Sequence, residues 1–180
     1  VVGFDRNPDV SDVDSIESMV DALGADGAPK VVWVMVPAGG PTHETINQLA
    51  ELLSPGDVVV DGGNSRWTDD QVHAALLAEK NIGYVDCGVS GGVWGLENGY
   101  ALMYGGEADD VEKVQPIFDA LRPEGDFGAV HAGKVGARHV EHRGLELGRV
   151  RHEVAAGDAA ERLASVADLS AVEIGERAAR

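Results

Sequence analysis

Short apolar runs alternate with longer amphipathic stretches along the first 136 residues of the chain. The apolar runs, such as Val31-Val-Trp-Val-Met-Val36, have the length and composition of buried strands, and the stretches between them show helical spacing of apolar residues. Strands that alternate with helices predict an α/β fold, here a Rossmann-like doubly wound parallel sheet. We expect strands at 1–4, 30–36, 57–61, 83–86, 101–105 and 128–131, and helices at 13–23, 42–53, 68–80 and 109–122.

Helix starts are predicted from polar residues that precede the helical pattern. Ser11 or Asp12 can cap the first helix, and Thr42 can cap the second after the loop 37–41. The texture changes after Gly136, because the chain becomes rich in Ala, Arg, Glu and Val and has no aromatic residue. We therefore divide the chain into a domain at 1–136 and a tail at 137–180. The tail is expected to be irregular or helical, with a possible helix at 158–168.

Glycine-rich turns follow two of the predicted strands. Asp61-Gly-Gly-Asn-Ser65 follows Val58-Val59-Val60, and Val89-Ser-Gly-Gly92 follows Tyr84-Val85-Asp86. Ligands of open parallel sheets bind beyond the carboxyl ends of the strands, and glycines there allow close approach to the backbone. Tight turns without a ligand are the alternative for either stretch alone. Their occurrence on successive strands favours a substrate site formed by Asn64, Ser90, Gly91 and Gly92.

The composition excludes several classes of partner. The net charge is −17, which argues against a nucleic-acid-binding protein and against docking on an anionic membrane. No apolar run approaches the length of about 20 residues that a membrane-spanning helix needs. The single cysteine, Cys87, cannot form an intrachain disulfide, so the chain suits a reducing cytoplasm. A packed thiol is the favoured interpretation of Cys87, and a nucleophile is the alternative.

The same two turns carry a resemblance to a known family. Asp61-Gly-Gly-Asn-Ser65 and Gly88-Val-Ser-Gly-Gly92, followed by Trp94-Gly-Leu-Glu-Asn-Gly-Tyr-Ala-Leu-Met103, resemble 6-phosphogluconate dehydrogenase, decarboxylating, in its short bacterial form. The resemblance runs from about Val1 to Gly136. It implies an oxidoreductase of the pentose phosphate pathway and gluconate metabolism. That enzyme converts 6-phosphogluconate to ribulose 5-phosphate and carbon dioxide with NAD or NADP, and it needs no metal.

The resemblance places the cofactor half on the first predicted strands. Asp5 ends the second strand of the family fold, where a carboxylate accepts hydrogen bonds from the adenosine ribose and favours NAD over NADP. The neighbouring Arg6 leaves NADP open, and a turn cap is the alternative role for Asp5. Val36, Pro37 and Ala38 would line the cofactor, and Asn64 would touch both nicotinamide and substrate. The chain has no G-x-G-x-x-G turn, so we expect the first strand, this turn and the first helix to lie upstream of residue 1.

The catalytic half of the resemblance is incomplete. The family lysine has no counterpart, and Lys134 lies in the turn before the expected helix. His142 and Glu146 could match the substrate histidine and the catalytic acid, and a solvated helix face is their alternative role. The tail 137–180 stands in place of the large helical domain that builds the family homo-oligomer, so that assembly is doubtful here. We expect this chain to be impaired or inactive as an enzyme, and to be poorly stable without the central first strand.

Two other functions remain open at this point. One is a non-catalytic module that binds a nucleotide or a sugar phosphate in the surviving crevice. The other is a different 3-hydroxyacid dehydrogenase, because that family shares the Val89-Ser-Gly-Gly92 turn. Asp61 to Ser65 argues against it, since such enzymes usually have a serine-rich turn at this place.

Overall fold

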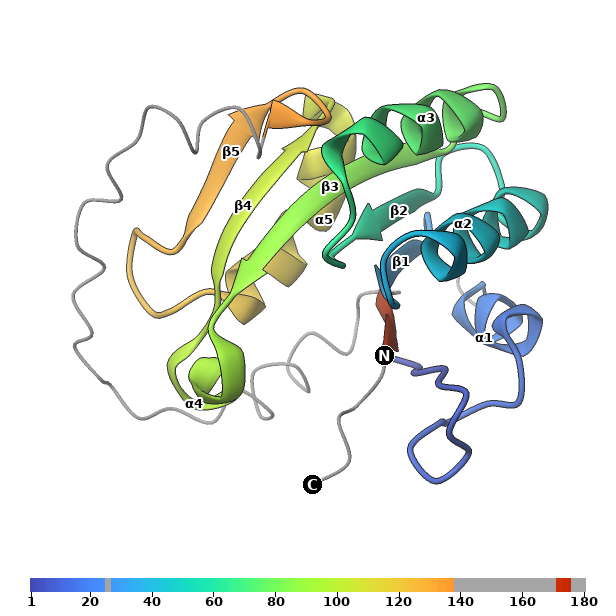
Figure 1. The fold of residues 1–180 in the computed structure, drawn as a ribbon, viewed down its shortest axis with the longest axis horizontal. Coiled ribbons are helices and arrows are strands. Elements are labelled where there is room, and N and C mark those ends of the chain that lie inside the picture. Colours follow the sequence, from blue (N-terminus) through green and yellow to red (C-terminus); the bar gives the residue numbers. More distant parts are fainter. Residues whose placement is uncertain (25–26, 138–170, 176–180) are drawn as a thin grey trace.

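The computed structural model describes residues 1–24, 27–137 and 171–175, and its centre is a mixed six-stranded sheet (Figure 1). The strands are β1 (Val31–Met35), β2 (Val58–Asp61), β3 (Gly83–Ser90), β4 (Ala101–Gly106), β5 (Ala129–Gly133) and β6 (Ala171–Gly175). The helices are α1 (Ile16–Leu23), α2 (Gly40–Leu52), α3 (Trp67–Ala78), α4 (Gly95–Asn98) and α5 (Ala108–Leu121), with a short 3-10 helix at Gly92–Trp94. Across the sheet the order is β5-β4-β3-β2-β1-β6.

The strand directions confirm the Rossmann-like class and correct one part of it. β6, β1, β2 and β3 run parallel, but β4 pairs with β3 in the antiparallel direction, and β5 follows β4. The physical reason is the connection between β3 and β4. It comprises only residues 91–100 and has no long helix, whereas a parallel return needs a crossover of a dozen or more residues.

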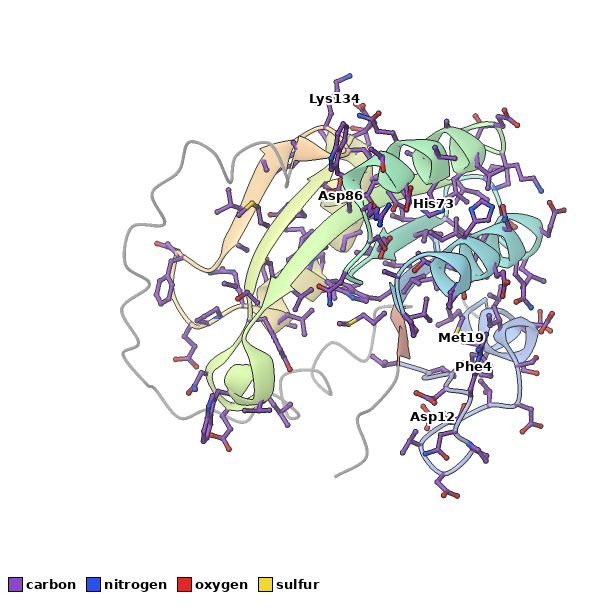
Figure 2. All side chains as sticks on the ribbon, in the orientation of Figure 1. Phe4, Asp12, Met19, His73, Asp86 and Lys134 are labelled. Atoms are coloured by element: carbon purple, nitrogen blue, oxygen red, sulfur yellow. The ribbon has the colours of Figure 1, made fainter. Side chains whose placement is uncertain are left out.

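Helices cover the two faces of the sheet with separate cores. On one face α1, α2 and α3 bury Met19, Ile46 and Leu77 against Val32 and Val59. Figure 2 shows Phe4 beside Met19 of α1, and Phe4 is packed against this core. On the other face α5 packs its apolar side against β1 to β4 (Figure 1). The alternation of inward-facing residues along each buried strand divides the apolar side chains between the two cores.

One predicted strand and two predicted helix caps are wrong. Residues 1–4 form no strand of the sheet, because Phe4 makes only an isolated bridge. Ser15, not Ser11 or Asp12, caps α1 through its side chain. Gly39 precedes α2, and Thr42 lies inside this helix with its hydroxyl donating to the carbonyl of Pro37 at 3.0 Å.

Residues 1–4 lie outside the sheet, and the position beside β1 is occupied by β6. Residues 1–4 are held instead by Asp12, which accepts the amide of Gly3 at 2.8 Å, while its own amide donates to the carbonyl of Gly3.

The expected irregular or helical tail contains a strand. Val31 to Met35 pair in register with Ala171 to Gly175. An unpaired edge of β1 would leave a row of backbone donors and acceptors without partners, and a parallel strand satisfies them. The possible helix at 158–168 lies outside the described residues. Among those that are described, no helix is long and apolar enough to cross a membrane.

Candidate substrate and cofactor site

The loops that follow β1, β2 and β3 lie together at the carboxyl ends of these strands, because the strands are parallel and adjacent. We call this end of the sheet its carboxyl edge. Asp61 of β2 pairs with Asp86 of β3, so Asn64 and Ser90 lie three and four residues beyond the same level of the sheet. Both residues are exposed. The register therefore puts the loop of Asn64 and the end of β3 beyond the same ends of the parallel strands, and a shared substrate site there stays a prediction.

The loops after β1 and β2 touch each other. The amide of Gly62 donates to the carbonyl of Val34 at 2.9 Å, and a side chain at Gly63 would lie 3.2 Å from the carbonyl oxygen of Val36. Val36 is half-buried beside this contact, while Pro37 and Ala38 are exposed at the tip of their loop. The residues predicted for the cofactor, Val36 to Ala38, thus adjoin the loop that carries Asn64.

Close packing fixes the backbone of the Asn64 loop. A methyl group at Gly62 would lie 2.2 Å from the indole nitrogen of Trp33, so only glycine fits there. Ser65 is buried, and its hydroxyl has no hydrogen-bond partner among the described residues. A buried polar group without a partner beside a glycine cradle suits a polar ligand.

Ser90, Gly91 and Gly92 lead into a turn built on Tyr100. Ser90 is the last residue of β3, which runs four residues further than predicted. A side chain at Gly91 would meet the ring of Tyr100 at 2.8 Å, and one at Gly95 would meet the same ring at 2.1 Å. The exposed backbone of this turn is therefore held close to an aromatic ring at the rim of the sheet.

Asp5 forms hydrogen bonds within its own turn. Its carboxylate accepts the amide of Asn7 at 2.7 Å, and its amide donates to the hydroxyl of Ser11 at 3.0 Å. This is the turn-capping role that the sequence offered as the alternative for Asp5. His142 and Glu146 lie outside the described residues.

A buried polar network beneath the Asn64 loop was missed by the sequence analysis. The hydroxyl of Tyr84 lies 3.3 Å from Asp61 Oδ2 and 3.1 Å from Asp70 Oδ1, and Asp61 and Asp70 are fully buried. His73 follows Asp70 on α3, and its Nε2 lies 3.2 Å from Nδ1 of His43 on α2. The available signal was the spacing of Asp70, His73 and Leu77, which places two polar residues on the buried side of a helix.

Burial changes the acid–base properties of His73, which lies on α3 facing α2 (Figure 2). Desolvation lowers the pKa of His73 below its ordinary value, the carboxylate of Asp61 acts in the opposite direction, and His43 lowers it further. Nδ1 of His73 is buried without a hydrogen-bond partner in the part of the chain that is described. The neutral ring is therefore favoured, with one proton shared between the two facing nitrogens.

The lysines lie at the opposite edge of the sheet. The chain has four, and each is in an ion pair: Lys30 with Asp57, Lys80 with Glu51, Lys113 with Asp110, and Lys134 with Glu107. Lys30 precedes β1 and Lys134 follows the antiparallel β5, so both lie near the amino ends of β1 to β3. Lys134 also lines a cavity of about 400 Å³ beside Gly83, far along β3 from Ser90.

The loops at the carboxyl ends of β1 to β3 offer neutral hydrogen-bonding groups, and all four lysines of the chain lie elsewhere. Asn64, Ser90 and the glycine backbone offer neutral donors and acceptors for a polyol and a carboxamide. The described residues contain no group of three or more His, Cys, Asp or Glu side chains that could hold a metal ion. They also supply no G-x-G-x-x-G turn for a pyrophosphate, so the residues present fit the nicotinamide end of a dinucleotide and not its phosphates.

The fold and the edge with its three loops define a dinucleotide-binding α/β domain of the dehydrogenase type. Comparison with known proteins identifies the family. Residues 5–125 match the model of the NAD binding domain of 6-phosphogluconate dehydrogenase. The chain belongs to this family, as the resemblance of the two turns implied.

Curated relatives agree with the family match. The chain is 37% identical to 6-phosphogluconate dehydrogenase, decarboxylating, of Synechococcus elongatus over 87% of its length, which covers 34% of that protein. It is 40% identical to the NAD(+)-dependent, decarboxylating enzyme of Haloferax volcanii over 74% of its length, or 43% of that protein. The chain thus spans between about a third and somewhat under half of the length of these relatives.

Solved structures support the fold alone, because their sequences are less similar. A Plasmodium falciparum 6-phosphogluconate dehydrogenase, solved also with NADP+ and with 6-phosphogluconate, has a TM-score of 0.64 at 23% identity over 72% of this chain and 28% of that one. A 3-hydroxyisobutyrate dehydrogenase of Mycobacterium tuberculosis has a TM-score of 0.56 at 24% identity, over 62% of this chain and 38% of that one. The fold is therefore shared with 3-hydroxyacid dehydrogenases, and the sequence match identifies the family.

Proposed function

We propose that this chain binds a nicotinamide dinucleotide and 6-phosphogluconate at the carboxyl edge of β1 to β3. The observation that carries the proposal is the contact between the loops after β1 and β2, which places Val36 to Ala38 beside the loop of Asn64. These loops lie within the residues that match the NAD-binding family. Asn64 and the Ser90-Gly91-Gly92 turn supply the hydrogen bonds that orient the sugar acid.

The reaction belonging to this site is the oxidative decarboxylation of 6-phosphogluconate to ribulose 5-phosphate. Hydride passes from the substrate carbinol to the nicotinamide, and a base must take the hydroxyl proton. No lysine of the chain lies at this edge. We therefore propose that residues 1–180 bind both ligands but turn over slowly or not at all.

Calorimetric titration of the 180-residue chain tests the binding. We expect 6-phosphogluconate to bind in the presence of NAD, and Asn64→Ala to weaken this binding about tenfold or more, since it removes a hydrogen bond to a desolvated polar ligand. Asn47→Ala is the matched control, because Asn47 lies on α2 away from the edge loops. Equal affinities of wild type and Asn64→Ala would refute the assignment.

Cofactor choice and turnover are measured in the same preparation. NAD is the proposed cofactor and NADP the alternative, because curated relatives include an NAD(+)-dependent enzyme and the Plasmodium structure holds NADP+. Absorbance at the reduced nicotinamide band reports turnover. Turnover at the rate of a whole enzyme would contradict the absence of a base.

Binding without turnover would make the chain a sugar-phosphate-binding module. This second function is favoured because no lysine is at hand as a base: Lys134, for example, pairs with Glu107 and lines the cavity beside Gly83. A cytoplasmic location belongs to the same proposal, because the single cysteine, Cys87, is buried and forms no disulfide. No homo-oligomer is part of the proposal.

A further inference from the structure

Both ends of the loop that carries Asn64 lie within hydrogen-bond distance of one phenol, that of Tyr84. Asp61 is the last residue before the loop, and Asp70 lies in the first helical turns after it. Tyr84 of β3 rises between them, with its hydroxyl oxygen 3.3 Å from Asp61 Oδ2 and 3.1 Å from Asp70 Oδ1. A single buried side chain on the neighbouring strand thus contacts the residues that bracket 62–69.

Asp61 also contacts the backbone of the loop. Its other carboxylate oxygen, Oδ1, accepts the amide of Gly63 at 2.9 Å, one residue before Asn64. An Asp that bonds the amide two residues on forms an Asx-turn, and the direction in which Asn64 leaves that turn depends on the rotamer of Asp61. Because Asp61 is fully buried, Tyr84 is well placed to fix that rotamer.

The opposite face of the sheet offers a matched comparison. Tyr104 of β4 is also 4% exposed, as is Tyr84, and its hydroxyl contacts Gln115 Oε1 at 3.3 Å on α5. Removal of either hydroxyl therefore deletes one buried polar atom from an aromatic ring of equal size. Only Tyr84 is connected to a loop at the ligand edge.

We propose that the Tyr84 hydroxyl is a positioning group that holds the Asn64 loop in its ligand-binding conformation, with its one proton donated to the carboxylate of Asp61 at one end of the loop or of Asp70 at the other. The ligand part of this inference rests on the proposed function. The loop part does not, because the contacts among Tyr84, Asp61 and Gly63 exist without a ligand. Tyr84 acts through the loop and touches no substrate atom.

The test compares Tyr84→Phe with Tyr104→Phe in the whole 180-residue chain. Hydrogen exchange at the Gly63 amide is measured by NMR, with the amide of Val59 as the internal reference for the intact sheet. We expect Gly63 to exchange about tenfold faster in Tyr84→Phe, since one net hydrogen bond that restrains the loop is lost. Tyr104→Phe should leave Gly63 unchanged.

The affinity for 6-phosphogluconate in the presence of NAD is then measured for the same proteins. We expect about a tenfold loss in Tyr84→Phe and no change in Tyr104→Phe. If wild type does not bind the sugar acid, the proposed function fails, and the exchange of Gly63 still decides the role of Tyr84. An unchanged Gly63 amide in Tyr84→Phe would overturn the inference.

A second variant covers the case in which Tyr84→Phe does not fold. Asp70→Ala removes the far end of the contact from α3 and leaves the ring of Tyr84 in its core. We expect faster exchange at Gly63 in this variant as well, with Val59 still protected. Protection of both amides equal to wild type in Asp70→Ala would contradict attachment of the loop at its helical end.

Discussion

The two faces of the sheet differ in what they bury. The face covered by α5 is apolar and aromatic: Phe118 stacks on Tyr104 with ring centroids 3.9 Å apart and meets Trp33 edge-on at 5.9 Å. The face beneath α2 and α3 also has an apolar core, but near the carboxyl edge it buries Asp61, Asp70 and His73.

This difference indicates a division of roles within one small domain. Buried polar groups add little net stability compared with apolar side chains of similar size, because their desolvation offsets their hydrogen bonds. They do impose specific geometry, since each donor must meet an acceptor. The α5 face therefore holds the sheet together, and the polar part of the α3 face orients the loop of Asn64.

The largest expected effect lies on the α5 face. Phe118→Ala removes a fully buried ring from contact with Tyr104 and Trp33. We expect it to lower the free energy of unfolding by about 3–5 kcal/mol, as measured by urea denaturation. Phe127→Ala, at a side chain that is 53% exposed, should change it by less than about 0.5 kcal/mol. Similar losses for both would break the comparison between the two faces.

A smaller loss of stability is expected at Gly62, in the loop that follows β2. Gly62→Ala places a methyl group 2.2 Å from the indole nitrogen of Trp33, so ring or loop must move. We expect a loss of about 1–3 kcal/mol in the free energy of unfolding and a shift in tryptophan fluorescence. Gly40→Ala, where a methyl group meets nothing within 4 Å, is the control and should be neutral or stabilising. A neutral Gly62→Ala would show that the loop is not packed against Trp33.

The smallest effect is a pH dependence on the polar face. Burial lowers the pKa of His73, so the unfolded chain takes up the proton first as the pH falls below about 6.5. Stability from the neutral ring is complete above that pH and is lost as the pH falls towards the lowered value. We expect the free energy of unfolding to decrease less between pH 7.5 and 5.5 in His73→Phe than in wild type.

His131→Gln is the control for this measurement, because His131 is exposed on β5. It should keep the pH dependence of wild type. Identical slopes of unfolding free energy against pH in wild type and His73→Phe would contradict the buried, neutral state of His73.

The sequence predicted the elements whose signal is local. The apolar runs of β1 and β2 and the helical spacing of α5 lie within one or two residues of their predicted bounds. The glycine turns at 61–65 and 89–92 were recognised because a glycine next to a strand marks a close approach of the backbone. The same turns identified the family that residues 5–125 match.

What the sequence did not predict depends on contacts between distant segments. The pairing of β1 with residues 171–175 joins positions that are remote in the chain, and their composition carries no mark of a partner. The direction of β4 follows from the length of a connection that contains two short helices of its own. The network of Tyr84 joins β2, β3 and α3, and each member alone resembles an ordinary polar residue of a soluble domain.

Chemical-shift mapping of the 180-residue chain with NAD and 6-phosphogluconate tests the central claim most directly. The carboxyl-edge site predicts shifts at the amides of Asn64, Ser90 and Gly91 that saturate with ligand. The amides of Ala78 and Gly83, which line the cavity at the opposite edge, should stay unchanged. Saturable shifts confined to Ala78 and Gly83 would contradict the account.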